Sequence, residues 1–256
     1  SNYLMASRLK PNTISTYMRM LRSIYNRGVD MHQAPYVHGL FRDVFTGVDT
    51  RQKKAIPISE LHMLLNKDPQ SEKLRRTQAI ANLVFQFCGM PFSDLAHLEK
   101  SNLERGLLKY NRTKTGTPMS IEVLESAQNA IGGLYNKSDA RSSGYPDYLF
   151  RILSGAYKRN EEGAYREYQS ALRRFNNELK SLSRKLSLHP PVTSYTLRHS
   201  WATTAKYRGV PIEMISESLG HKSIKTTQIY LKGFELEERT KVNKLNYSYV
   251  CNFKML

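Results

Sequence analysis

Three residues in the last quarter of the sequence have side chains that together suit phosphate chemistry. Arg198 lies at the centre of SYTLRHSWATT, His221 follows Gly220 in LGHKSIKTT, and Tyr230 comes shortly after it. A guanidinium group binds two phosphate oxygens, an imidazole donates a hydrogen bond or moves a proton, and a phenol can act as a nucleophile. Together these residue types suggest cleavage of a phosphodiester through a covalent phosphotyrosine.

A fourth candidate, Lys114, lies in a segment that is expected to form a β-hairpin. Apolar and polar side chains alternate over residues 107–114, TGTP at 115–118 is typical of a turn, and a second alternating run ends at Val123. Side chains two apart on a strand point to the same face, so Arg112 is expected beside Lys114. The departing oxygen of a phosphodiester needs a proton, which the ammonium group of Lys114 can supply.

Each of these residues also has a structural interpretation. Tyr230 is one of 16 tyrosines, and Arg198 by itself would be an ordinary surface or ion-paired arginine. His221, just after a helix end, would be a cap or a packed side chain, while Arg112 and Lys114 would form a solvated strand face. The order and spacing of the residues, more than their types, favour the chemical interpretation.

Helical periodicity accounts for most of the remaining sequence. Helices are expected over residues 12–25, ending at Gly28, over 59–65, 76–88 and 164–186, around Arg198, from Pro211 to Gly220, and over a short segment with Tyr230. The hairpin supplies a small sheet, and residues 132–144 are expected to form a loop. The predicted fold class is therefore α+β, mainly α-helical, with a small antiparallel sheet.

The charge of the chain indicates a polyanionic partner. The 256 residues include 39 Lys and Arg against 22 Asp and Glu, which gives a formal net charge of +17. Lys and Arg that neutralise phosphates release condensed counterions, so this excess suits nucleic acid. Composition alone leaves DNA, RNA, an anionic membrane surface and a merely basic protein open.

Composition argues against a bound metal, a disulfide framework or a membrane span. Cys88 and Cys251 are the two cysteines, without CxxC spacing, and the seven histidines include no HExxH pattern. This cysteine usage fits a reducing cytoplasm. The most apolar stretch, residues 79–92, is too short to cross a bilayer, and the first ten residues lack the apolar core of a secretory signal.

The motifs closely resemble those of the tyrosine recombinases, also called the phage integrase family. TLRHSWATT resembles the family's second arginine motif, LGHKSIKTT its next box, QIYL its nucleophile segment, and RTKTG its hairpin motif. The resemblance implies that Tyr230 is the nucleophile, Arg198 a phosphate ligand, Lys114 the acid for the leaving group, and His221 a further catalytic residue. It implies no cofactor, no ATP and no metal ion.

Two positions depart from the family pattern. In GMPFSDLAHL, residues 89–98, Pro91 stands where the family has its first arginine, while Asp94 keeps an acidic position. Tyr195 replaces the histidine three residues before Arg198, where it would share that helix face. We expect Arg112 to supply the charge that is missing at Pro91.

The resemblance also implies the arrangement of domains. Residues 1–50 resemble the last helix of a core-binding domain whose earlier part lies outside this sequence. Residues 51–57 are expected to be a linker, and residues 58–256 a catalytic domain with a C-terminal tail. The tail is expected to pack against a neighbouring protomer.

The implied function is a site-specific DNA recombinase, an integrase of a bacterial mobile element. Its expected partner is double-stranded DNA, bound by a homotetramer that is monomeric when free, with accessory DNA-bending or directionality proteins and no membrane. The expected location is the bacterial cytoplasm, at the nucleoid. The expected DNA contacts are Arg112, Lys114, Arg198, His199 and Lys222.

Two other functions fit the same sequence. Pro91 and Tyr195 suggest a catalytically silent DNA-binding protein on the same scaffold. A type IB topoisomerase shares the chemistry, although the motifs resemble those of mobile elements more closely. A covalent adduct with nicked DNA would distinguish an enzyme from a silent protein.

Overall fold

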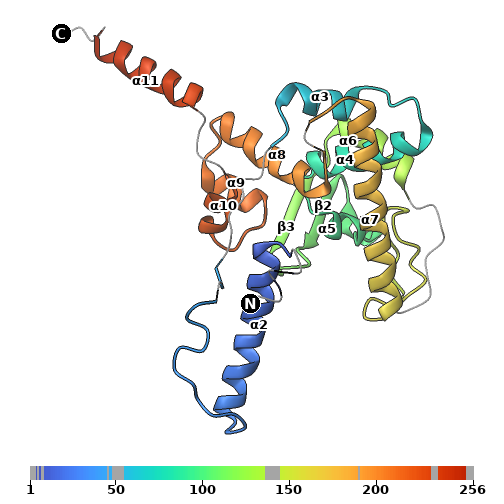
Figure 1. Cartoon of the computed structure of the whole chain (residues 1–256). Helices are drawn as coiled ribbons and strands as arrows, with labels where there is room; N and C mark the ends of the chain where they lie inside the picture. Colours follow the sequence, from blue (N-terminus) through green and yellow to red (C-terminus); the bar gives the residue numbers. More distant parts are fainter. Residues whose placement is uncertain are drawn as a thin grey trace. The chain divides into compact units, whose positions relative to one another are not determined.

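The computed structural model of the chain describes residues 9–44, 46–47, 55–135, 145–189, 191–231 and 236–251, together with positions 4 and 6. The chain forms two compact units, Ser1–Gln52 and Lys53–Leu256. Figure 1 shows helices over most of the described chain and a small sheet in the larger unit. The predicted α+β class is confirmed.

The smaller unit is built around α2, Pro11–Asp30. Pro11 occupies the first turn, where its fixed φ angle suits a helix and its missing N–H costs nothing. The expected end at Gly28 is wrong, since the helix continues through that residue to Asp30. Ile14 and Met18, four residues apart on this helix, are buried, whereas Tyr17 and Leu21 are exposed.

In the larger unit, the expected helices are present, with ends shifted by a few residues. They are α3 (Ile58–Asn66), α4 (Glu72–Gln86), α7 (Glu162–Lys185), α8 (Ser194–Tyr207), α9 (Ile212–Ser218) and α10 (Ile224–Tyr230). Elements that the sequence did not predict are α5 (Phe92–Ala96), the 3-10 helix η1 (Lys100–Asn102), the short strand β1 (Leu103–Glu104), α6 (Glu125–Leu134) and α11 (Leu236–Cys251). The loop expected over residues 132–144 is therefore wrong for its first three residues, which end α6, and residues 136–144 lie outside the described ranges.

Helix α4 lies at the centre of the larger unit. It packs against α3, α6, α7 and α8, as Figure 1 shows. Its apolar side chains Leu83 and Val84 are fully buried in the core. Across the core, the rings of Phe92 and Phe175 stack with their centroids 4.8 Å apart and so join α5 to α7. This packing fixes the turn between α4 and α5, which carries part of the site.

The sheet has three antiparallel strands in the order β1 (Leu103–Glu104), β2 (Leu107–Asn111) and β3 (Pro118–Glu122). Leu108 faces Ile121 in the β2–β3 register, and both side chains are buried. The predicted hairpin is therefore confirmed. Its turn begins earlier than the sequence suggested, because the strand ends at Asn111.

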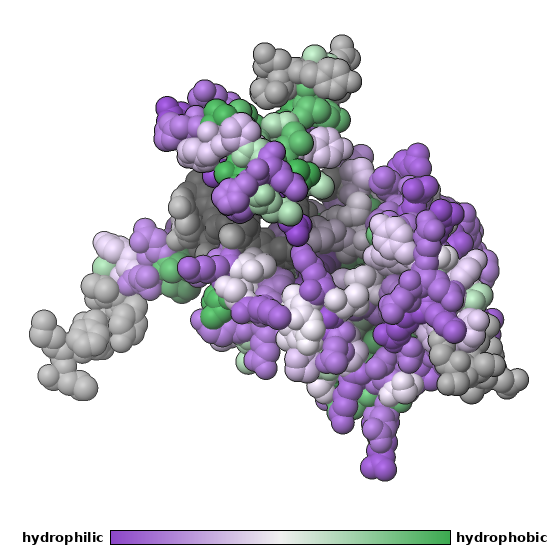
Figure 2. Space-filling view, turned by 90° about the horizontal axis from the view of Figure 1, so that it is seen from below, coloured by the Kyte–Doolittle hydropathy of each residue, from purple (hydrophilic) through white to green (hydrophobic). Residues whose placement is uncertain are grey.

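The surface of the molecule is mostly polar on the face shown in Figure 2, where hydrophobic residues form scattered patches between hydrophilic ones. Within the described ranges, no helix is both long enough and apolar enough to cross a membrane.

Candidate active site

Arg198 is buried on α8 and joins two distant turns of the chain. Thr193 caps the helix and accepts a hydrogen bond from the backbone N–H of Thr196, which fixes the start of α8. The Arg198 side chain is 5% exposed and donates to the carbonyl of Gly89 at 2.9 Å and to that of Leu219 at 2.6 Å. Its guanidinium therefore holds the turn after α4 next to the turn after α9.

The turn after α4 can approach Arg198 only because residue 89 is a glycine. Gly89 has φ +64°, and a Cβ atom placed on it would lie 3.1 Å from the Cα atom of Arg198 and 3.2 Å from its Cγ atom. The preceding residue, Cys88, also has a positive φ of 54°. A side chain at position 89 would thus be strained and would push the turn away from Arg198.

The turn after α9 presents Leu219 and His221 to the same place. Gly220 has φ +65°, while the N–H of His221 donates to the carbonyl of Ser216 and that of Gly220 to Glu217. This is the Schellman arrangement that glycine permits at a helix end. The sequence had predicted the role of Gly220 as a helix end, and that prediction is confirmed.

Arg112 lies beside Arg198. Its side chain is 7% exposed, and its Nη1 atom donates to the same Leu219 carbonyl at 2.9 Å. Its Nε atom lies 3.0 Å from Oδ2 of the buried Asp94. Among the described residues, no hydrogen bond uses Nη2 of Arg112. Two guanidinium groups therefore converge on one backbone oxygen, and one carboxylate compensates the charge of the second.

Lys114 lies in the hairpin turn, and its side chain is exposed. The N–H of Arg112 donates to the carbonyl of Thr117, and that of Gly116 to the carbonyl of Arg112. The expectation that Arg112 and Lys114 share a strand face is therefore wrong, because both follow the last strand residue. Lys114 is still close enough for its charge to affect His221.

His221 carries a strongly perturbed imidazole. Its Nε2 atom lies 3.1 Å from Nη2 of Arg198, and its Nδ1 atom lies 2.8 Å from Oγ1 of Thr227. Burial lowers its pKa to about 4, and the charges of Arg198, Arg112 and Lys114 act in the same direction. The imidazole is therefore neutral at neutral pH.

This depressed pKa predicts a pH-dependent stability. Between about pH 6.5 and pH 4, an unfolded chain binds a proton on His221 that the folded chain does not bind. The free energy of unfolding is thus expected to fall as the pH is lowered through this window. His221→Gln keeps polar atoms at the position but cannot titrate. Urea unfolding at several pH values is expected to show a difference between wild type and variant that changes across the window; a constant difference would contradict the prediction.

The remaining predicted site residues are placed less centrally. Tyr195 is 44% exposed, although it precedes the buried Arg198 by one helical turn. His199 is 3% exposed, so its burial gives no support to the predicted DNA contact, whereas Lys222 is exposed. Tyr230 is the last residue of α10, and its side chain lies outside the described part of the structure.

Sequence reasoning missed Thr227 and the Leu219 carbonyl. Thr227 is fully buried and contacts His221 directly. Its place three residues before Tyr230, on the same short helix, was a signal that could have identified it. No feature of the sequence could have indicated the Leu219 carbonyl, because every residue has a backbone carbonyl.

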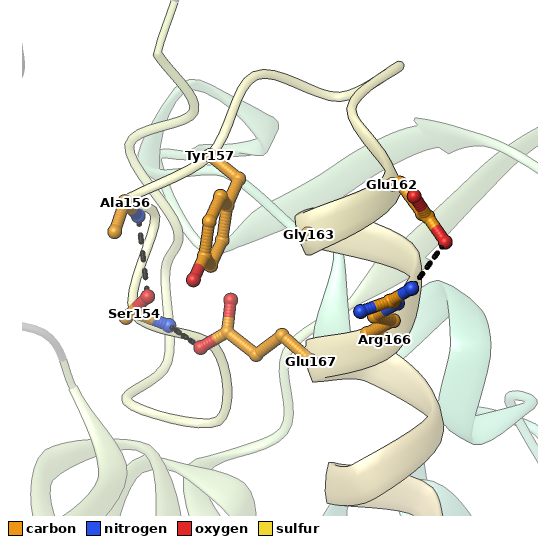
Figure 3. A pocket seen from close by; sticks show the side chains of 7 residues that line it. All are labelled: Ser154, Ala156, Tyr157, Glu162, Gly163, Arg166 and Glu167. Atoms are coloured by element: carbon orange, nitrogen blue, oxygen red, sulfur yellow. Dashed lines mark hydrogen bonds and ion pairs between the residues drawn. The ribbon is translucent and has the colours of Figure 1, made fainter.

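A separate pocket lies at the start of α7 and contains none of the predicted site residues (Figure 3). Glu167 accepts a hydrogen bond from the N–H of Ser154 at 2.7 Å, and Glu162 pairs with Arg166 at 2.6 Å. Two carboxylates against one guanidinium make it a poor phosphate site. Among the described residues, no group of three or more His, Cys, Asp or Glu is arranged to hold a metal ion.

The cluster of Arg198, Arg112 and His221 can bind an oxyanion next to the helix that carries Tyr230. Comparison with known proteins assigns the chain to a family. The model of the phage integrase family matches residues 55–236, which include the whole cluster. The chain belongs to the phage integrase family.

Relatives in this family share moderate identity with the chain. A "Probable integrase/recombinase protein" of Methanocaldococcus jannaschii is 28% identical over 204 residues, which cover 77% of this chain and 58% of that protein. The tyrosine recombinase XerD of Halalkalibacterium halodurans is 30% identical over 190 residues, which cover 70% of this chain and 57% of XerD. The matched part of the chain thus spans less than two thirds of the length of each of these two relatives.

The fold resembles that of solved integrases. The integrase of transposon Tn1549, in complex with a circular intermediate DNA, has a TM-score of 0.68 at 15% identity, covering 94% of this chain and 82% of that one. At this identity the likeness concerns the fold.

Proposed function

We propose that the chain is a site-specific DNA recombinase of a mobile element, which cleaves and rejoins DNA through a 3′-phosphotyrosyl intermediate. The observation that carries the proposal is the convergence of Arg198 and Arg112 on the Leu219 carbonyl, with His221 in contact with Arg198, in the turn before the helix that carries Tyr230. Buried cations of this kind stabilise charge on the non-bridging oxygens of a phosphodiester under attack.

Each residue has a role in the proposed reaction. The phenolic oxygen of Tyr230 gives its proton to the neutral imidazole of His221 and forms a bond to phosphorus while the bond to the 5′ oxygen breaks. Lys114 gives the departing 5′ oxygen a proton. Arg198 binds the non-bridging oxygens, and His221 adds a hydrogen bond or carries a proton. The exposed Tyr195 contacts the phosphate backbone next to Arg198. Rejoining reverses these steps, so neither ATP nor a metal ion takes part.

Arg112 replaces the arginine that is missing at position 91. Pro91 precedes α5 and carries no charge, whereas Asp94 on that helix holds the Arg112 guanidinium beside Arg198. Nη2 of Arg112 is the group that would reach a phosphate oxygen. In this way Asp94, the acidic residue of the segment 89–98, positions the guanidinium group of Arg112, which comes from the hairpin.

The double variant Arg112→Gln with Asp94→Asn tests this replacement. Arg112→Gln alone leaves a buried carboxylate without its partner, so it is expected to destabilise the fold by about 3–5 kcal/mol. The second change removes that charge and is expected to restore most of the stability, as urea unfolding would show. Cleavage in the double variant is still expected to be roughly 10²–10³-fold slower, because a transition-state cation is lost. A double variant that cleaves at the wild-type rate would show that Arg112 is not a clamp.

The proposed partner is double-stranded DNA, which the net charge of +17 suits. The solved structure of the Tn1549 integrase contains DNA, which supports this partner. Arg112, Lys114, Arg198 and Lys222 are the proposed contacts. We further propose a homotetramer on DNA that is monomeric when free. The exposed described side chains of α11, residues 240–248, offer a surface for a neighbouring protomer.

The proposed domains follow the sequence prediction. Residues 1–50 form the end of a core-binding domain, residues 51–57 a linker, and residues 58–256 the catalytic domain and its tail. The observed division of the chain near residue 52 supports this arrangement.

The experiment uses a pool of nicked duplexes whose sequence around the nick is randomised. Cleavage next to the nick releases a short strand and so traps the covalent intermediate. Adducts that survive denaturation, and whose DNA has a common sequence, are the expected result. DNA binding without any adduct would overturn the proposal and leave a catalytically silent DNA-binding protein.

A further inference from the structure

Thr227 links the imidazole of the site to the helix that carries the proposed nucleophile. It is fully buried in α10, and its Oγ1 atom lies 2.8 Å from Nδ1 of His221. Its carbonyl also accepts the N–H of Leu231, which follows the end of the helix. One residue thus contacts the site with its side chain and the end of α10 with its backbone.

The contacts of His221 determine which ring nitrogen carries the proton. A guanidinium group has donors and no acceptor, so Nη2 of Arg198 donates to Nε2 of His221 across their 3.1 Å contact. Nε2 is therefore unprotonated, and in the neutral ring the proton lies on Nδ1. From there it is donated to the Thr227 hydroxyl.

This arrangement directs the lone pair of Nε2 toward the guanidinium group of Arg198. The burial of Thr227 keeps water from replacing its oxygen as the acceptor for Nδ1–H. The tautomer is thus set by two partners together, Arg198 as the donor to Nε2 and the Thr227 hydroxyl as the acceptor for Nδ1–H, and loss of either partner weakens it.

We infer that Thr227 is a positioning residue, which stabilises the Nδ1–H tautomer of His221 and joins α10 to the cluster of Arg198, Arg112 and His221. The part of this inference that concerns the reaction rests on the proposed function; the tautomer does not. Because Tyr230 lies three positions further along α10, the same hydroxyl couples the placement of the nucleophile to the orientation of the imidazole.

The first test is the ¹⁵N NMR spectrum of the full chain labelled at histidine. The seven histidines require an assignment, which the missing signals of His221→Gln provide. The expected spectrum of His221 near pH 7 shows a protonated Nδ1 and an unprotonated Nε2. Thr227→Ser keeps this pattern, whereas Thr227→Val, of nearly the same shape, moves the two nitrogen shifts toward each other. A proton on Nε2 in wild type, or ring shifts that Thr227→Val leaves unchanged, would overturn the inference.

The second test measures the rate of adduct formation with the nicked duplexes. Thr227→Val is expected to slow adduct formation at least tenfold. The loss should not exceed the whole contribution of an acid–base group, which is roughly 10²–10⁴-fold. Thr227→Ser is expected to restore most of the rate. Thr226→Val is the matched control, because the neighbouring Thr226 is exposed on the same helix. Its rate is expected to equal that of wild type.

A double-mutant cycle separates positioning from a general structural effect. In the His221→Gln background, Thr227→Val is expected to cause no further loss of rate, since it acts through the imidazole. An equal loss in both backgrounds would overturn the positioning role. If wild type forms no adduct, the proposed function fails, while the NMR spectrum still decides the tautomer.

Discussion

Tyr230→Phe is expected to abolish the covalent protein–DNA adduct completely while DNA affinity stays at the wild-type level. The substitution removes one oxygen atom, which in the proposed mechanism forms the bond to phosphorus, and no other group can take its place in that bond. The phenyl ring keeps the volume of the side chain, so the fold should be unaffected. Denaturing gel electrophoresis after incubation with the nicked duplexes measures the adduct, and a filter-binding assay measures affinity.

A second tyrosine provides the control for this experiment. Tyr165 is an exposed residue of α7, and Tyr165→Phe is expected to form the adduct as wild type does. Adduct formation by Tyr230→Phe would show that another nucleophile attacks the DNA, and the assigned mechanism would then be wrong.

Arg198→Lys is expected to reduce cleavage by roughly 10²–10³-fold or more, although the charge is conserved. The planar guanidinium donates to two carbonyls and to His221 at once, whereas an ammonium group is a compact point charge with different geometry. A buried carbonyl that loses its donor costs about 1–3 kcal/mol, so the free energy of unfolding should also fall. Single-turnover adduct formation and urea unfolding measure the two effects.

Arg208→Lys is the matched control, because Arg208 is exposed at the end of the same helix. It is expected to change stability by no more than about 0.5 kcal/mol and to leave cleavage unchanged. If Arg198→Lys cleaved DNA as fast as this control, a phosphate ligand with guanidinium geometry would not be needed at position 198.

These effects are large because the cluster is enclosed. Arg198 and Arg112 are both buried, and Asp94 compensates only one of the two charges. Electrostatic interactions are stronger where water is excluded. Burial of His221, followed by the charges of Arg198, Arg112 and Lys114, lowers its pKa to about 4. A bound phosphate would bring negative charge to the cluster and would favour the protonated form of His221.

The sequence predicted most of the elements that carry the site. Helix α4, the β2–β3 hairpin and the helix end at Gly220 all appeared where the pattern placed them, apart from small shifts of their ends. These features depend on residues that are close in the sequence, so spacing and turn chemistry reveal them. The continuation of α2 through Gly28 was missed, because a glycine inside a helix costs only about 1 kcal/mol and the rest of the helix outweighs it.

What the sequence by itself determined is the set of residue types and the local elements that hold them, including Arg198 on α8 and His221 after α9. The tertiary structure alone decided that Arg112 leaves the strand, binds Asp94 and shares the Leu219 carbonyl with Arg198. Arg112 and Leu219 are 107 positions apart in the chain. Packing of the core brings such distant groups together, and a buried guanidinium must then find its acceptors among whatever backbone and carboxylate oxygens the fold places around it.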